Sequence, residues 1–462
     1  MKIYGHPIAA AAVMAGTLLS IQGLQTPARA DGSGSCCADL EERIAELEAT
    51  TARKGNRKVS VTVSGWVNEA LFAWDDGVER NAYIGTNFVE QSRFRFVGEA
   101  KIDKDWSAGY TLEIGVQGHP SNRWDQDFIG SQHAAEANRE FALNLRKSSW
   151  FLKSKTHGKV TVGLEAMATY HLLDDADPTL TRNVDDVEGA GVFLAAFRLL
   201  HDGTRIGGLR WTDALRGIAN STPGDGLRRD IVRYDTPEWH GFSAAASIGE
   251  TYIGDVMAQY KGDIGDYTLV VRGGWGWSND PGTLQDDGPL GDFVVGGTTC
   301  ISSSTTLTST PNFHCQWGGA GGTVMHNPTG LFLYGGWGQF TTTTDHVFPP
   351  GTVFDTTSNM FFLQPGIERK WIDLGKTNIF GEYRRDESGS AVGRTVSSNV
   401  DTWQAGIIQK IDNADMTLYL VYQNSSGDVI GNEVTEKAKF APDGKTSLDA
   451  FQILVSGAKI NF

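Results

Sequence analysis

From Val59 onward, apolar and polar side chains alternate with a period of two. The pattern is clearest between Trp106 and Gln117, where every second residue is apolar and the residues between them, including Glu113, are small or polar. Residues 267–277 and 416–422 repeat it. Successive side chains of a strand point to opposite faces, so the pattern predicts strands with one apolar and one polar face.

The alternating segments predict sixteen strands, at 59–74, 88–102, 106–117, 140–154, 159–168, 228–236, 242–250, 255–263, 267–277, 318–326, 330–342, 357–369, 376–386, 399–411, 415–424 and 448–462. Strands of soluble proteins average about 5–6 residues, whereas a tilted strand that crosses a bilayer needs about 9–11. Most of these segments have nine to sixteen residues. Their length favours a membrane barrel over a soluble sandwich of two sheets.

The connections between the segments alternate in length. Short joins at 103–105, 156–158, 237–241, 264–266, 327–329, 370–375 and 412–414 alternate with long ones at 75–87, 118–139, 169–227, 278–317, 343–356, 387–398 and 425–447, and only 251–254 departs from the rule. Short periplasmic turns and long external loops are typical of outer-membrane barrels. We therefore predict an all-β fold, a sixteen-stranded antiparallel transmembrane β-barrel spanning residues 59–462, with both termini in the periplasm.

The N-terminal residues predict export. Lys2, a short apolar run at 8–19 and an Ala-Arg-Ala site at 28–30 are typical of a cleaved signal peptide over residues 1–30. The apolar run is too short to be a membrane-spanning helix. Residues 31–58 would then form a periplasmic segment.

Within that segment, residues 39–54 have a helical period. Leu40, Ile44, Leu47 and Thr51 follow one another at intervals of four, three and four, with mostly charged residues between them. Such spacing predicts a short coiled coil that helps to hold an oligomer together. Two heptads are marginal on their own, so a solvated helical spacer is the alternative.

Charge and composition exclude other classes of protein. The net charge is −15, and removal of Lys2 and Arg29 with the signal lowers it to −17. An acidic chain does not favour nucleic-acid binding, which needs a basic face. The 56 glycines and 10% aromatic residues suit many strands joined by turns. No motif indicates a cofactor or a metal.

The four cysteines fall into two pairs. Cys300 and Cys315 are fifteen residues apart in a Ser-, Thr- and Gly-rich loop, and an oxidising compartment predicts a disulfide between them. A metal role with His314 is the alternative. The adjacent Cys36 and Cys37 cannot easily pair with each other, which leaves a bridge between subunits or free thiols.

The chain ends on an aromatic residue. Phe462 follows Ile460 and Ala458 on the same apolar face, although Ser456 interrupts the row. An aromatic residue at the end of an apolar alternating strand is typical of the signal that barrel-assembly machinery recognises. We therefore expect Phe462 to direct insertion into outer-membrane lipid.

Three segments resemble the Gram-negative general porin family. Residues 63–77 (VSGWVNEALFAWDDG) resemble its first strand and loop, residues 92–99 (SRFRFVGE) its second strand, and residues 230–242 (DIVRYDTPEWHGF) its recurring strand–turn signature. The N-terminal helix and vicinal cysteines are similar to porins of alphaproteobacterial type. The resemblance implies a homotrimer of barrels, each with its own pore for small hydrophilic solutes and ions. It also implies that the loop after strand five, here 169–227, folds inward as the constriction.

Charged residues on the polar faces are the candidates for the pore lining. Arg93 and Arg95 alternate with phenylalanines, so the arginines should face the lumen, because an arginine facing lipid costs about 2–4 kcal/mol. The candidates on the pore wall are Arg93, Arg95, Glu113, Arg229, Arg233 and Arg272, and those on the constriction loop are Asp174, Asp175, Asp177, Asp185, Asp186 and Glu188.

Acids on an inward loop facing arginines on the wall would create a transverse field that filters solutes by charge and size. The alternative is that the acids are solvated or bind a divalent cation. The two sets of charges oppose each other, and the net charge favours cations slightly. Eight aromatic residues are interpreted as lipid-facing or interfacial, with a sugar-binding ladder as the alternative: Trp66, Trp74, Trp106, Trp275, Trp277, Trp337, Tyr334 and Trp403.

Three other functions compete with a general pore. A channel specific for a sugar, phosphate or small organic acid is the main alternative. An outer-membrane enzyme would need a nucleophile or acid activated by a neighbouring histidine, and the ten histidines are scattered with no G-x-S-x-G or H-E-x-x-H motif. We therefore expect no catalytic residues. An adhesin or plugged structural barrel is the third alternative.

Overall fold

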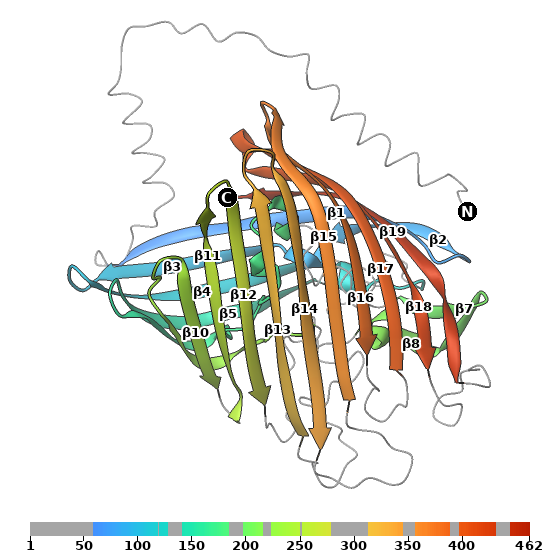
Figure 1. The fold of residues 1–462 in the computed structure, drawn as a ribbon, viewed down its shortest axis with the longest axis horizontal. Helices are drawn as coiled ribbons and strands as arrows, with labels where there is room; N and C mark the ends of the chain where they lie inside the picture. Colours follow the sequence, from blue (N-terminus) through green and yellow to red (C-terminus); the bar gives the residue numbers. More distant parts are fainter. Residues whose placement is uncertain are drawn as a thin grey trace, which may run out of the picture.

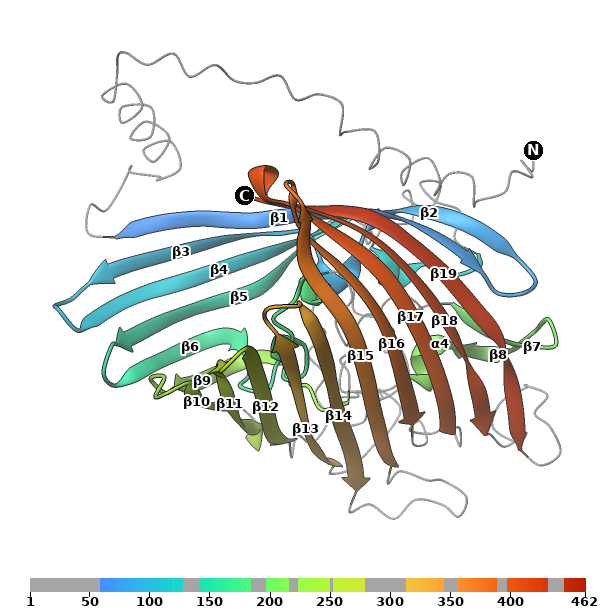
Figure 2. The ribbon, with the colours of Figure 1, turned by 45° about the horizontal axis from the view of Figure 1, so that its top comes forward.

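Strand pairing closes the chain into a barrel (Figures 1 and 2). In this computed structural model every strand of the main sheet pairs antiparallel with its neighbours, and β1 (Ser60–Asp75) pairs with β19 (Lys445–Asn461). The structure describes residues 59–118, 120–127, 141–183, 197–215, 223–249, 252–278, 313–344, 356–388, 397–430 and 444–462. The predicted N-terminal helix, Cys36 and Cys37 lie outside these residues.

The predicted sixteen-stranded barrel is confirmed. The main sheet has seventeen strand segments, of which β2 (Arg80–Thr86) and β3 (Arg93–Lys101) are successive parts of one barrel strand. Besides β1 and β19, the others are β4 (Trp106–Gly118), β5 (Phe141–Ser154), β6 (Gly158–Ala166), β9 (Arg228–Asp235), β10 (Phe242–Gly249), β11 (Gly254–Ile264), β12 (Tyr267–Ser278), β13 (Phe313–His326), β14 (Leu331–Thr344), β15 (Thr356–Ile372), β16 (Gly375–Ser388), β17 (Ser397–Ile411) and β18 (Met416–Ile430).

The second barrel strand is interrupted at its centre. Residues 60–66 of β1 pair with β3, and residues 69–75 pair with β2. Between the two, the chain makes a 3-10 turn at Phe88–Glu90 and is held by a hydrogen bond from the Asn68 amide to the Ser92 hydroxyl (3.0 Å). The sequence predicted a loop over 75–87, but residues 80–86 are strand. The predicted strand 88–102 also begins too early, because the polar run 90–92 breaks the alternation and β3 starts only at Arg93.

The two faces of the sheet have the polarity that the alternation predicts. On β12, Tyr267, Val271 and Trp275 are exposed on the outside, whereas Arg272 is buried on the inside. The same holds on β4, where Leu112 and Val116 are exposed and Glu113 is buried. An apolar exterior around a charged interior is the polarity of a barrel in lipid. Within the described residues no helix is long and apolar enough to cross a membrane.

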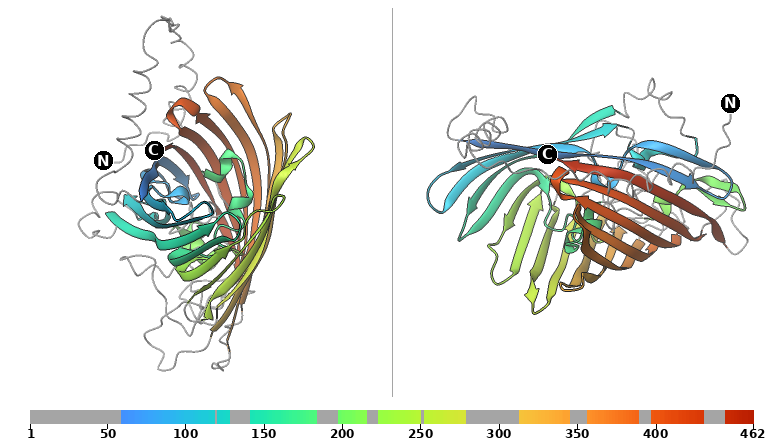
Figure 3. Two further views of the ribbon diagram at one scale, coloured as in Figure 1. Left: turned by 90° about the vertical axis from the view of Figure 1, so that its left-hand side faces the viewer. Right: turned by 90° about the horizontal axis from the view of Figure 1, so that it is seen from above.

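A long segment between β6 and β9 lies inside the barrel. We call residues 167–227 the inner segment; its described parts contain two 3-10 turns (Asp174–Ala176 and Leu180–Asn183), the hairpin β7 (Arg198–His201) and β8 (Thr204–Arg210), and the short helix α4 (Trp211–Ala214). Figures 2 and 3 show these elements on the inner side of the curved sheet. The sequence predicted a loop here and missed the hairpin.

Aromatic rings pack the inner segment against β1 and β19. Phe197 lies 5.1 Å from Trp74 and 4.6 Å from Phe451 between ring centroids, and Trp211 lies 6.3 Å from Phe451. All four side chains are buried. Each such buried aromatic contributes about 3–5 kcal/mol to stability, so the inner segment is a packed part of the fold.

The last residue completes the seam of the barrel. The Phe462 and Gly65 backbones exchange two hydrogen bonds of 3.0 Å, and the Phe462 ring is exposed on the outer face. The ring is therefore accessible from outside the barrel. Whether it acts as an assembly signal stays a prediction.

Replacing Phe462 with serine is expected to lower the amount of folded barrel in the outer membrane several-fold, because the terminal strand loses its aromatic end while its backbone pairing is kept. The matched control is Tyr422→Ser, which removes an equally outward aromatic from β18. Heat-modifiable mobility of outer-membrane fractions measures the folded yield. Equal losses in both variants would show that Phe462 has no special role in assembly.

Candidate functional site

An acid on the inner wall gathers three arginines. Glu113 on β4 is only 1% exposed and accepts hydrogen bonds from Arg146 Nε (2.8 Å) and Arg93 (3.5 Å), as well as from Arg95. Arg95 stands directly opposite Glu113 in the register of β3 and β4. Arg146 comes from a bulge in β5, where the pairing with β4 shifts by one residue.

From this cluster a chain of ion pairs crosses the lumen. Arg93 contacts Glu90 (3.3 Å), and Glu90 contacts Arg182 of the inner segment (3.2 Å). Arg182 then contacts Asp175 (3.1 Å), which contacts Arg272 on β12 (2.6 Å). The inner segment is thereby tied to two distant parts of the wall by alternating charges.

The other predicted acids of the inner segment are not free in the lumen where they are described. Asp174 is buried against His171, with Nδ1 and Oδ2 2.6 Å apart. Asp177 is buried and accepts hydrogen bonds from the Thr179 amide (2.8 Å) and the Thr181 hydroxyl. Burial raises the pKa of Asp177 above its ordinary value, and these hydrogen bonds offset that only in part. Asp185, Asp186 and Glu188 lie outside the described residues.

Further polar contacts fix the path of the inner segment, and sequence reasoning missed them. Asp255 on β11 accepts from the Thr169 amide and hydroxyl, both at 2.6 Å. Glu368 on β15 accepts from the Leu180 amide at 2.8 Å. Asp255 is followed by the apolar Val256, as on the predicted wall strands, whereas Glu368 is followed by Arg369 and Lys370. The sequence does not show that either acid meets the inner segment.

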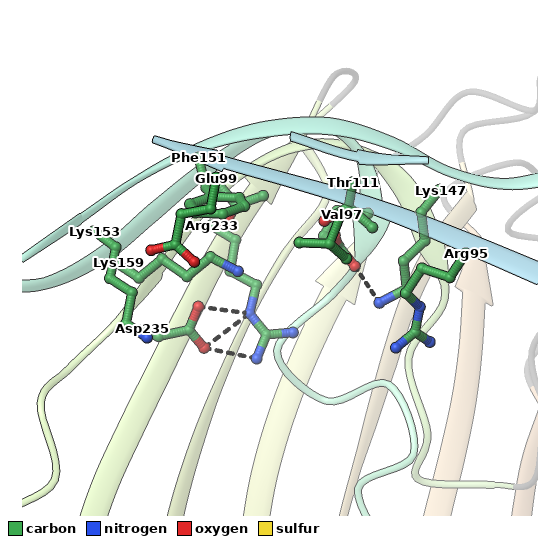
Figure 4. Close-up of a pocket in the computed structure, with 12 residues that line it drawn as sticks. Arg95, Val97, Glu99, Thr111, Lys147, Phe151, Lys153, Lys159, Arg233 and Asp235 are labelled. Carbon is green, nitrogen blue, oxygen red and sulfur yellow. Dashed lines mark hydrogen bonds and ion pairs between the residues drawn. The ribbon is translucent and has the colours of Figure 1, made fainter. Parts of the chain in front are cut away.

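A basic pocket opens beside the ion-pair chain, on the inner wall of β3–β6 and β9 (Figure 4). Its volume is about 500 Å³, and it is lined by Arg95, Val97, Glu99, Thr111, Lys147, Phe151, Lys153, Lys159, Thr161, Glu165, Arg233 and Asp235. Five of these side chains are basic and three are acidic. Two of the acids are paired, Glu165 with Lys147 (2.5 Å) and Asp235 with Arg233 (2.7 Å).

None of the three lysines of this pocket was predicted. Lys147 lies within β5, whereas Lys153 and Lys159 come from the ends of β5 and β6 nearest their turn. The Lys159 ammonium lies 4.7 Å from the centre of the Phe151 ring. Lys153 and Lys159 stand opposite each other in the register. Their alternation with Leu152 and Val160 was visible in the sequence and would have placed them on the inner face.

The predicted wall residues end up at three places. Arg93, Arg95 and Glu113 meet in the arginine cluster, Arg233 lines the basic pocket, and Arg272 closes the far end of the ion-pair chain. Arg229 stands opposite Glu165 in the register of β9 and β6, on the same inner face. Besides the lysines, Asp255 and Glu368, sequence reasoning also missed Glu90, Arg146 and Arg182.

Three of the aromatic assignments are wrong. Trp66 faces the interior, where Arg93 and Lys459 each lie 4.3 Å from its ring. Trp74 packs in the aromatic core, and the buried Tyr334 donates a hydrogen bond to the Leu173 carbonyl (2.9 Å). An aromatic ring fits lipid and a packed interior equally well, so residue type did not decide the face. Trp275, Trp337 and Trp403 are exposed on the outer face as expected.

Cys315 is fully buried on the inner face of β13, with Sγ 3.5 Å from Thr342 Oγ1. Cys300 lies outside the described residues. The disulfide between them stays a prediction.

The sequence matches a family model. Residues 10–438 match the model described as Gram-negative porin. The chain belongs to the Gram-negative porin family. Members of this family are outer-membrane channel proteins rather than enzymes, which places this barrel in the outer membrane. No curated protein matched the sequence.

Several solved porin structures are similar to this chain. The anion-selective porin from Comamonas acidovorans is 14% identical, covers 87% of this chain and 100% of its own, and superposes with a TM-score of 0.54. OmpT of Vibrio cholerae is 13% identical, with coverages of 88% and 99% and a TM-score of 0.48. Salmonella typhi OmpF, in complex with daunomycin, is 12% identical, with coverages of 88% and 98% and a TM-score of 0.48. At 14% identity, the similarity to the Comamonas porin shows the fold alone.

Proposed function

We propose that this porin is a water-filled channel for passive diffusion of small hydrophilic solutes and ions, narrowed by the inner segment. The supporting observation is the basic pocket beside an ion-pair chain that ties the inner segment to opposite walls. Charged side chains held in a confined lumen filter solutes by charge and size without tight binding.

We further propose that the channel prefers anions. Asp174, Asp175 and Asp177 of the inner segment are engaged in ion pairs or hydrogen bonds, whereas the wall of the pocket carries two more basic than acidic side chains. A narrow passage between low-dielectric walls concentrates the field of such charges. The excess of acids in the whole chain therefore does not determine the sign at the pocket.

Several finer assignments belong to this proposal. The wall and constriction residues act as the selectivity filter, with Asp185, Asp186 and Glu188 extending the constriction, and the barrels associate as homotrimers. Residues 1–30 act as the cleaved export signal, and the short coiled coil and the Cys300–Cys315 disulfide reinforce the assembly. Outer-membrane lipid and the barrel-assembly machinery are the other partners.

Reconstitution of the detergent-purified protein into a planar bilayer tests the function. We expect stepwise openings in groups of three, since each subunit of a trimer has its own pore. In a KCl gradient, we expect the sign of the reversal potential to show that Cl⁻ passes more easily than K⁺. Conductance that saturates with one solute would favour the specific channel instead. Folded protein with no conductance would overturn the proposal in favour of a plugged barrel.

A further inference from the structure

A row of polar side chains crosses the inner face of β15–β18. Gln404 on β17 is the direct partner of Glu382 on β16 and of Gln423 on β18. The antiparallel register of β15 and β16 continues the row to Gln364, which stands across from Glu382. We call these four residues the polar row. Each of them is 5% exposed or less, so water has little access to the row.

Glu382, in the middle of the polar row, forms no ion pair in the described part of the chain. Its carboxylate accepts a hydrogen bond from Gln404 Nε2 (3.1 Å). Arg384, two residues farther along β16 on the same face, donates from its guanidinium to Asp386 instead (2.7 and 2.8 Å). A buried carboxylate without a counterion is costly, and one amide donor offsets that cost only in part. Glu382 therefore needs either a proton or a bound cation.

The amide oxygens of the polar row also lack partners. Gln364 Oε1, Gln404 Oε1 and Gln423 Oε1 are buried and have no hydrogen-bond partner among the residues that the structure describes. In Gln404 the amide nitrogen faces the carboxylate of the row, because a carboxylate only accepts, so the oxygen points elsewhere. In Gln364 the nitrogen donates to the Thr181 hydroxyl (2.9 Å), whose own proton goes to Asp177. Nearly all buried polar atoms have a partner, so a group of unpaired acceptors points to a positively charged ligand.

A second carboxylate meets the polar row from the inner segment. Asp177 is buried, and the Thr181 hydroxyl joins it to Gln364 on the wall. Asp177 and Glu382 are close enough for their carboxylates to repel each other. Two acids are thus held near one another, away from water, where the inner segment contacts β16. A cation between them would turn this repulsion into attraction.

We propose that the polar row and Asp177 bind a calcium ion, which fastens the inner segment to β15–β17. Ca²⁺ takes about 6–8 oxygen ligands in flexible geometry, including carboxylates and the carbonyl oxygens of Asn and Gln. Glu382 and Asp177 supply the negative charge. The amides of Gln364 and Gln404 supply neutral oxygens. Mg²⁺ fits less well, because it demands near-octahedral geometry and keeps several waters. A proton on Glu382 would satisfy one unpaired oxygen and leave the other two, so the row as a whole favours a cation.

Calorimetric titration with CaCl₂ tests the site in the full-length protein, purified in detergent and freed of metal with a chelator. We expect saturable binding that MgCl₂ at the same concentrations does not reproduce. Glu382→Gln keeps the size of the side chain and is expected to weaken binding by about tenfold or more, because the number of charged ligands sets the affinity of calcium sites. The matched control is Glu387→Gln on the same strand, whose carboxylate pairs with Arg385 (3.0 Å) outside the row, and it should bind like the unmodified protein. No saturable binding by the unmodified protein, or equal affinities in the two variants, would overturn the proposal.

Heat denaturation followed by circular dichroism separates a bound cation from a bound proton. Calcium is expected to raise the melting temperature of the unmodified protein and of Glu387→Gln by several degrees, and to leave that of Glu382→Gln unchanged, because only a ligand bound to the folded state stabilises it. A melting temperature that rises on acidification and does not respond to calcium would show that Glu382 holds a proton, and the proposal would be wrong. If Glu382→Gln does not fold, the titration of the unmodified protein decides alone. None of these readouts depends on conduction, so a failure here is distinct from a failure of the proposed channel.

Discussion

Replacing Lys153 and Lys159 with glutamate is expected to turn an anion-preferring channel into a cation-preferring one. The two substitutions change the basic side chains of the pocket from five to three and the acidic ones from three to five. In the pocket, Glu165 forms an ion pair with Lys147, and Asp235 forms one with Arg233. Lys153 and Lys159 take part in neither pair. The sign of the local charge is thereby inverted with little disturbance of existing pairs.

The size of the effect follows from the distance between fixed and permeating charges. Two unit charges about 4 Å apart interact by about 1 kcal/mol even in water, and by more beside a protein wall. About 1.4 kcal/mol corresponds to tenfold in a ratio, so we expect the anion-to-cation permeability ratio to fall by at least roughly tenfold. High salt screens these interactions, so the difference should shrink as KCl rises toward 1 M.

Reversal potentials across a KCl gradient measure the ratio. The matched control is Lys104→Glu with Lys155→Glu, which makes the same change in net charge at exposed positions in the turns beside this part of the wall. The reversal potential of this control should differ little from that of the unmodified protein. If both double variants shift the potential equally, the overall charge of the protein and not the pocket determines the preference.

The barrel could be predicted from the sequence because its two faces meet different solvents along the whole chain. Residues 106–117 and 267–277 were predicted almost to the observed ends of β4 and β12. The prediction fell short where strands continue beyond the bilayer. For example, the predicted strand ended at Asn424, whereas β18 extends to Ile430. Residues 424–427 have the composition of a turn, yet they pair with β17.

For the candidate site, the sequence predicted which face of a strand a residue lies on, but not which residues contact one another. Alternation placed Arg93, Arg95 and Glu113 on the inner face, and the structure brings them together. Arg146 was missed because the bulge in β5 shifts the alternation by one residue. Which loop acid meets which wall arginine depends on how the inner segment crosses the lumen. The pair of Asp175 with Arg272, for example, joins residues with no local relation in sequence.

Replacing residues 168–226 with a four-residue Gly- and Ser-rich turn is expected to raise the single-channel conductance several-fold. Ala166 on β6 and Arg228 on β9 are direct partners in the sheet, so a short turn can join the two strands without altering the barrel. A sixteen-stranded barrel is wide enough for an aqueous channel when nothing fills it. The inner segment lies across that space and is held at both walls by Arg182 and Asp175.

The same deletion is expected to lower the thermal stability of the barrel. Trp74 and Phe451 lose their contacts with Phe197 and Trp211, and Arg272 loses Asp175. Asp175 is 45% exposed in its pair with Arg272, so solvent screens the pair and its loss costs less than the about 3–5 kcal/mol of a fully buried one. Changing Arg272 to glutamine in the deletion variant removes that cost and is expected to recover part of the stability, without changing the raised conductance.

Circular dichroism on heating and planar-bilayer recordings measure the two effects separately. Asp175→Asn in the complete chain is the point variant that cuts the ion-pair chain while leaving the inner segment in place. It should raise the conductance less than the deletion and add fluctuations between levels, because the hydrophobic contacts and the Asp255 and Glu368 anchors still hold the segment. A folded deletion variant whose conductance equals that of the complete chain would show that the passage is limited elsewhere, and that the inner segment is not the constriction.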